Sequence, residues 1–154
     1  MDERESRAWL GLVAVTQLLP AALDSQLQRE AHLTHFEFMV LTVLRFAPQS
    51  TLRMTALADA THATLARLSH VCTRLEKRGV VERTPSPDDR RATDVRLTSD
   101  GRRMLIRAMP GHIATARRLV IDALTPAQLD ALAEIAESIT DRLTAGGACP
   151  PDRD

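Results

Sequence analysis

Cysteine and long apolar runs are both scarce in this 154-residue sequence. The two cysteines, Cys72 and Cys149, are too few for a disulfide framework, so a reducing cytosol is the default environment. No uninterrupted run approaches 18 apolar residues, and residues 1–7 lack the basic-then-apolar order of a secretion signal. We therefore expect a cytoplasmic protein with no membrane-spanning helix and no membrane partner.

Motifs for catalysis are also missing. The sequence has no phosphate-binding loop, no nucleophile elbow and no metalloprotease motif. Its histidines and cysteines match no zinc-site spacing. The adjacent carboxylates of Asp88 and Asp89 fall in a predicted turn, where exposed groups are poorly suited to acid–base catalysis. The sequence therefore predicts a protein that is not an enzyme and that uses no metal and no cofactor.

Net charge is absent as well, with 20 basic and 20 acidic residues. The distribution is uneven, however. Residues 62–107 carry eleven Arg or Lys against six Asp or Glu (+5), and residues 121–154 carry two against seven (−5). Because a phosphate backbone responds to local charge, the middle of the chain remains a candidate for nucleic-acid binding.

A chain of this length can bury one sizeable core, so residues 1–154 are most simply a single domain. Apolar residues at helical spacing predict a first helix over 6–30, which Pro20 should kink or split by removing one hydrogen bond. Thr34 and Glu37 have the spacing of a capping box and predict a second helix that ends before Pro48.

Two short segments after this helix form a helix-turn-helix pattern. Residues 54–60 predict a third helix, 61–63 a turn, and 64–78 a fourth helix that ends at Gly79. One face of the fourth helix is apolar, and the other is polar and basic. This outer face could read the major groove, or it could simply be solvated. The candidate DNA contacts on it are Arg67, Ser69, His70, Thr73 and Arg74.

A charged hairpin follows directly. Residues 80–84 and 93–98 alternate like paired strands around a proline- and aspartate-rich turn. Arg90 and Arg91 lie at its tip, where an arginine can enter the minor groove and Asp89 can hold its guanidinium. The alternative is an exposed, salt-bridged turn. A helix followed by a basic hairpin is the layout of a winged-helix DNA-binding domain.

The C-terminal part is predicted to be helical. A fifth helix over 99–123 should bend near Pro110, a sixth begins after Thr125, and residues 145–154 should fray. The sixth helix carries one apolar stripe, longer than a small winged-helix core needs. A two-fold dimer would bury this stripe and place two recognition helices about 34 Å apart. The competing interpretation is that the stripe packs on the first helix of the same chain.

Three stretches around the hairpin form a combined pattern: 75–83 (LEKRGVVER), 87–91 (PDDRR) and 97–102 (LTSDGR). The pattern resembles the multiple-antibiotic-resistance regulator (MarR) family, with Asp89-Arg90-Arg91 in the place of the family's Asp-x-Arg wing element. The resemblance implies a mainly α, winged helix-turn-helix fold of six helices and a two- or three-stranded antiparallel hairpin sheet. It also implies dimerisation helices within 6–33 and 99–145, and a DNA-binding lobe over 34–98.

The resemblance further implies a homodimeric repressor of a palindromic operator, released by a small aromatic or phenolic ligand. The corresponding pocket would be lined by Trp9, His35 and His112, although Trp9 could instead be a core or interface anchor. A set sensing urate would consist of Trp9, Asp59, Arg91 and Arg103. Redox sensing through Cys72 or Cys149, metal sensing, and a winged helix that contacts only proteins remain alternatives.

Overall fold

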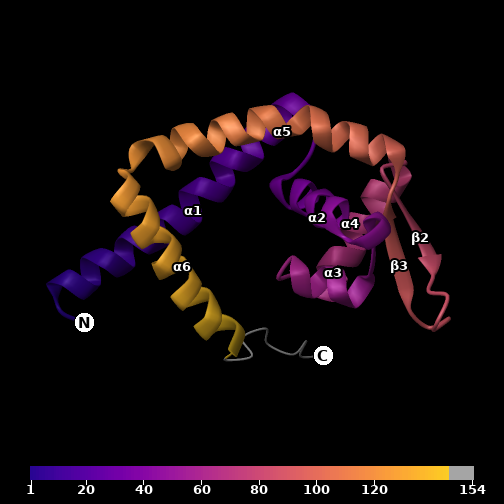
Figure 1. Ribbon diagram of the computed structural model, residues 1–154, viewed down its shortest axis with the longest axis horizontal. Helices are drawn as coiled ribbons and strands as arrows, with labels where there is room; N and C mark the ends of the chain where they lie inside the picture. Colours follow the sequence, from indigo (N-terminus) through magenta and orange to yellow (C-terminus); the bar gives the residue numbers. More distant parts are fainter. Residues whose placement is uncertain (146–154) are drawn as a thin grey trace. The chain divides into compact units, whose positions relative to one another are not determined.

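The computed structural model describes residues 1–145 (Figure 1). The chain divides into two compact units. The first unit is Met1–Thr115, and the second begins at Ala116. Of the tail predicted to fray (145–154), residues 146–154 lie outside the described residues, and Cys149 is among them.

The first helix, α1 (Glu3–Ala31), is longer than predicted and continuous. Asp2 caps it in a capping box with Glu5, and His32 ends it in the left-handed region at φ 52°. The expected split at Pro20 is wrong, because a proline removes only one hydrogen bond from a helix of 29 residues.

The composition of α1 also corrects the expectation drawn from apolar runs. By length and composition, α1 could cross a membrane, because polar residues such as Thr16 and Gln17 interrupt its apolar segment without adding charge. Such a test is weak on its own, since buried helices of water-soluble proteins pass it too.

Next comes the winged lobe. It consists of α2 (His35–Phe46), a 3-10 turn (Pro48–Ser50), β1 (Thr51–Arg53), α3 (Met54–Ala60), α4 (Leu65–Lys77), β2 (Val81–Pro85) and β3 (Thr93–Leu97). The strands form an antiparallel sheet in the order β1-β3-β2, so the hairpin gains a third, three-residue strand at its edge. The core lies between these helices and the sheet and includes side chains of α1 and α5. Its fully covered side chains include Leu27, Leu41, Leu44, Leu57, Leu68, Leu75 and Val95.

Helix α5 (Ser99–Leu119) begins against this lobe and remains helical through Pro110. It ends earlier than the predicted residue 123, and a 3-10 turn over Ile121–Ala123 follows. Gly101 lets the start of α5 lie close to the backbone of Val80, the residue before β2. A Cβ at position 101 would collide with the Val80 carbonyl oxygen. Thr98 Oγ1 donates to the Gly79 carbonyl at 2.7 Å and accepts from the Gly101 N–H at 3.0 Å.

The second unit contains α6 (Pro126–Ala145), which starts as predicted. Thr125 Oγ1 accepts from the Gln128 N–H at 3.3 Å, and Gln128 Oε1 accepts from the Thr125 N–H at 2.9 Å. None of the side chains of α6 is buried. Its predicted apolar stripe is exposed on this single chain at Leu132, Ile135, Ile139 and Leu143.

Candidate nucleic-acid interface

Helix α4 has the two-faced character that its sequence predicts. Thr64 caps it by accepting from the Arg67 N–H at 3.2 Å. The inner face is buried and holds the helix against the lobe. This face consists of Leu68, Val71, Cys72 and Leu75. The apolar anchorage fixes which side chains face outward.

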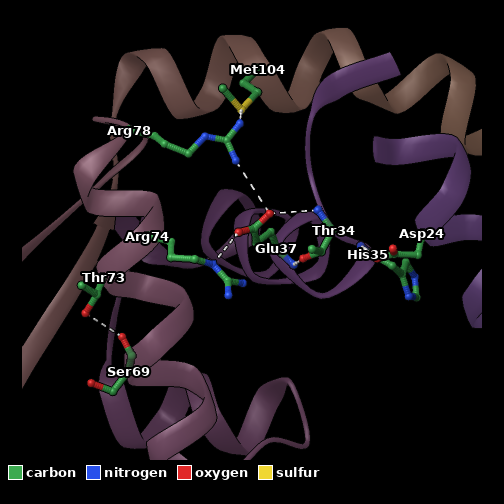
Figure 2. Close-up of polar contacts among 9 residues, drawn as sticks. All are labelled: Asp24, Thr34, His35, Glu37, Ser69, Thr73, Arg74, Arg78 and Met104. Atoms are coloured by element: carbon green, nitrogen blue, oxygen red, sulfur yellow. Dashed lines mark hydrogen bonds and ion pairs between the residues drawn. The ribbon is translucent and has the colours of Figure 1, made fainter. Parts of the chain in front are cut away.

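The five candidate contacts on α4 do lie on its outer side, with different degrees of freedom. Arg67, His70 and Arg74 are exposed, whereas Ser69 and Thr73 are half-buried. The Thr73 hydroxyl donates to the Ser69 carbonyl at 2.9 Å, so it is already engaged within the helix (Figure 2). Arg67, His70 and Arg74 are therefore the donors on this face that are most accessible to solvent.

The two arginines of α4 are both held by α2. The Arg67 guanidinium carbon lies 4.2 Å from the centroid of the Phe36 ring, a cation–π contact. Arg74 Nε donates to Glu37 Oε1 at 3.3 Å, and Glu37 is almost fully buried (Figure 2). The sequence suggested neither contact, because both join residues more than 30 positions apart.

A second contact joins the helix to the wing. Glu76, near the end of α4, accepts from Arg83 of β2 through the backbone N–H at 3.1 Å, Nε at 3.0 Å and Nη2 at 2.6 Å. The side-chain hydrogen bond from Arg83 is the main reason that the pKa of Glu76 lies below its usual range. This clamp fixes the strand that leads to the wing tip relative to α4.

At the wing tip the predicted contact is replaced by another. The Asp89 carboxylate accepts from the backbone N–H of Arg91 at 3.0 Å, not from its guanidinium. The Asp89 carbonyl also accepts from the Ala92 N–H at 2.9 Å. Asp89, Arg90 and Arg91 are all exposed. Asp89 therefore shapes the turn. The prediction that its carboxylate holds the Arg91 guanidinium is wrong for the chain without DNA, because the nearby backbone N–H of Arg91 is the donor that the carboxylate binds.

A cavity of about 740 Å³ opens beside α4 within the first unit. Its walls come from α1, α2 and α4. The lining includes Pro20, Asp24, His35, Phe36, Met39, Arg67, His70 and Arg74. Of the three predicted ligand residues, only His35 lines it. Trp9 is exposed near the start of α1, and none of the four residues of the urate set lies in the lining.

His112 is not in the lining of the cavity but stacks against His35, which is. Their rings stack with centroids 5.9 Å apart, and the Phe38 ring lies 4.3 Å from that of His112. Burial lowers the pKa of both histidines below the ordinary value, opposed at His35 by the charge of Asp24 and reinforced at His112 by His35. The pair thus joins α2 to α5 as neutral, stacked rings.

The redox and metal alternatives gain nothing from the described residues. Cys72 is buried in the core, and this burial raises the pKa of its thiol to about 11, which suppresses the reactive thiolate. Within residues 1–145, no cluster of three or more His, Cys, Asp or Glu side chains could hold a metal ion.

The comparisons with known proteins agree with this geometry. The sequence model of the MarR family matches residues 32–92. Sco3205 of Streptomyces coelicolor, a MarR family transcriptional regulator solved in complex with DNA, is 38% identical, with a TM-score of 0.88 over all of this chain and 93% of its own. AbsC, a MarR family regulator of the same organism, is 32% identical, with a TM-score of 0.89 over 94% of this chain and 97% of its own.

A shorter match covers about half of the chain. The uncharacterized HTH-type transcriptional regulator YdcH of Bacillus subtilis is 32% identical over 83 residues, or 53% of this chain and 56% of YdcH. The matched part thus spans about half the length of this relative. A six-helix winged fold and a relative 38% identical along the whole sequence place the chain in the MarR family, whose members are transcription regulators and not enzymes.

Proposed function

We propose that the protein is a cytoplasmic, homodimeric repressor that binds a palindromic operator through α4 and the wing. The main observation that supports this proposal is the clamp between Glu76 and Arg83, which fixes the wing with its two tip arginines relative to the exposed donors of α4. A helix suits the major groove, and a hairpin arginine suits the narrow minor groove. We assign the contacts to Arg67, Ser69, His70, Thr73, Arg74, Asp89, Arg90 and Arg91, with Asp89 acting on the backbone of the tip.

Arg91 provides the sharpest test. Arg91→Ala should weaken operator binding in a gel-shift titration without changing the melting temperature, because its side chain is exposed and makes no hydrogen bond or ion pair within residues 1–145. The matched control is Arg4→Ala, which removes an exposed arginine from the first turn of α1, outside the residues assigned to dimerisation. Binding should also weaken steeply with salt, since released counterions drive it. Equal affinity of the wild-type and Arg91→Ala proteins would remove the wing from the mechanism.

Dimerisation is supported by apolar side chains that a single chain leaves in water. In the first unit, they lie along α1 and include Trp9, Leu10, Val15 and Leu18. In the second unit, they form the stripe of α6. Exposed apolar surface of this extent marks an interaction site, and a second copy of the chain would supply the matching surface. We therefore assign 6–33 and 99–145 to dimerisation and 34–98 to DNA binding.

A small aromatic ligand would fit the cavity beside α4. Phe36 and Met39 provide apolar walls, and Arg67, His70 and Arg74 provide donors for a phenolate or carboxylate. These three donors are also proposed DNA contacts, so an occupant would compete with the operator for them. Calorimetric titration with 2-hydroxybenzoate, with Met39→Trp to fill the cavity as control, tests this. Binding that survives Met39→Trp would place the ligand elsewhere.

A further inference from the structure

We propose that Glu37 is a positioning residue for DNA binding, which presents the guanidinium of Arg74 to the operator. Arg74 is one of the contacts of the proposed function, so the inference rests on that function. Glu37 itself is buried beneath α4 and cannot reach DNA. It acts through the orientation of an arginine that can.

The Glu37 carboxylate is enclosed by donors from several elements. Its side chain is only 6% exposed. Oε2 accepts from the Thr34 N–H at 2.8 Å and lies 3.7 Å from Nη1 of Arg78, while Oε1 accepts from Arg74 Nε (Figure 2). Arg78 in turn donates through Nη2 to Met104 of α5 at 3.6 Å. One buried charge therefore connects the start of α2 with the end of α4 and with α5.

The contact through Nε is what orients Arg74. A guanidinium has five N–H donors in a rigid planar fork, so fixing Nε–H sets the direction of the two terminal amino groups. In Figure 2 the terminal groups of Arg74 point away from Glu37. The side chain of Arg74 is 58% exposed, so these groups are available for bidentate binding of a phosphate.

Because Arg78 also contacts Glu37, Arg74 can bind Glu37 and a DNA phosphate at the same time. An isolated buried carboxylate is strongly destabilising, so Glu37 needs a cation that stays in place when Arg74 also binds a phosphate. Arg78 is less exposed, at 32%, and is held by Met104 as well. The two arginines thus have different tasks: Arg78 compensates the buried charge, and Arg74 extends from it to the DNA.

The test measures operator affinity of the full chain against salt concentration for Arg74→Ala, Glu37→Gln and the double variant. Gln is accepted at the third position of a capping box, so Thr34 should still cap α2. We expect Arg74→Ala and Glu37→Gln each to lower affinity and to reduce the salt slope by about one, as for the loss of one phosphate contact. The double variant should lose no more than Arg74→Ala alone. Glu82→Gln, which neutralises an exposed carboxylate paired with Arg96, should leave the slope unchanged.

Each result has a distinct meaning. If Arg74→Ala lowers affinity and slope but Glu37→Gln keeps the wild-type slope, the positioning role is wrong and the proposed DNA contact stands. If Arg74→Ala itself keeps affinity and slope, the contact is wrong, and the inference falls with it. Should Glu37→Gln unfold, the Nε–H resonance of Arg74 in wild-type protein decides: it should be slow to exchange with solvent, and rapid exchange would overturn the proposal.

Discussion

At the residue scale, the half-buried pair of His35 and His112 makes stability depend on pH. The pKa values of His35 and His112 are lowered in the folded chain, so the unfolded chain, with ordinary values near about 6.5, binds protons first as pH falls. This preferential protonation has no effect on stability at pH values well above the ordinary histidine pKa, and it destabilises the fold progressively as the pH falls below it. We expect the urea midpoint to fall between pH 7 and pH 5, and His112→Phe, which keeps a ring beside Phe38, to reduce the fall.

The control for this prediction is His70→Phe, which changes an exposed histidine of α4. It should leave the pH dependence of the midpoint as in the wild type. A His112→Phe protein with an undiminished fall would mean that other groups cause the acid sensitivity.

Cys72 should be inert in the native state. It is fully covered, and with a thiol pKa of about 11 its thiolate fraction at pH 8 is only roughly one in a thousand. In a Cys149→Ser variant, reaction with Ellman's reagent should therefore occur only as fast as the protein unfolds. Rapid labelling of the native variant would return redox sensing through Cys72 to consideration.

Individual roles were predictable where they depend on near neighbours in the sequence. The capping by Thr34 and Thr125, and the outward direction of Arg67 and Arg74, follow from spacings of three and four residues. The partners of these arginines were not predictable, because Phe36 and Glu37 approach them only through tertiary packing. Asp89 was assigned the right neighbour but the wrong atom, since charge alone favours a guanidinium over a backbone N–H.

At the scale of elements, the joint between the lobe and α5 depends on Gly101. A Cβ there would collide with the Val80 carbonyl oxygen and come within 2.7 Å of Leu97 Cδ1. Because the obstructing atom belongs to the backbone, Gly101→Ala should destabilise the protein by about 1–3 kcal/mol in urea denaturation.

Gly111 of the same helix provides the matched control. Its Cβ would meet only the ends of the Glu30 and Gln26 side chains, and these can move. Gly111→Ala should therefore cost far less than Gly101→Ala, since alanine also favours a helix. Equal losses for the two variants would contradict the steric explanation.

Most elements were predictable from periodicity and caps, including the helix-turn-helix and the wing. The edge strand β1 was not, because three residues are too few to show alternation and its pairing with β3 spans more than 40 positions. The continuity of α1 through Pro20 was also missed, since the local rule for proline ignores the length of helix on either side.

At the scale of the whole molecule, the exposed stripe of α6 predicts the oligomeric state. Light scattering should give about twice the 17.0 kDa of one chain. Ile135→Glu would place a charge in the stripe and should shift the protein toward monomer and weaken operator binding together. The exposed Glu134→Gln serves as control. A monomeric wild type, or a dimer indifferent to Ile135→Glu, would show that α6 does not form the interface.

The clamp between Glu76 and Arg83 also bears on which DNA shapes the protein could bind. With helix and strand tied together, the protein would fix the spacing between the groove contacts proposed for α4 and the wing, and we expect the DNA to bend or narrow to match it. Substitutions on the surface of α4 can therefore change which bases are preferred while the accepted groove geometry stays the same. Base preference and the required DNA shape could therefore be changed separately in such a regulator.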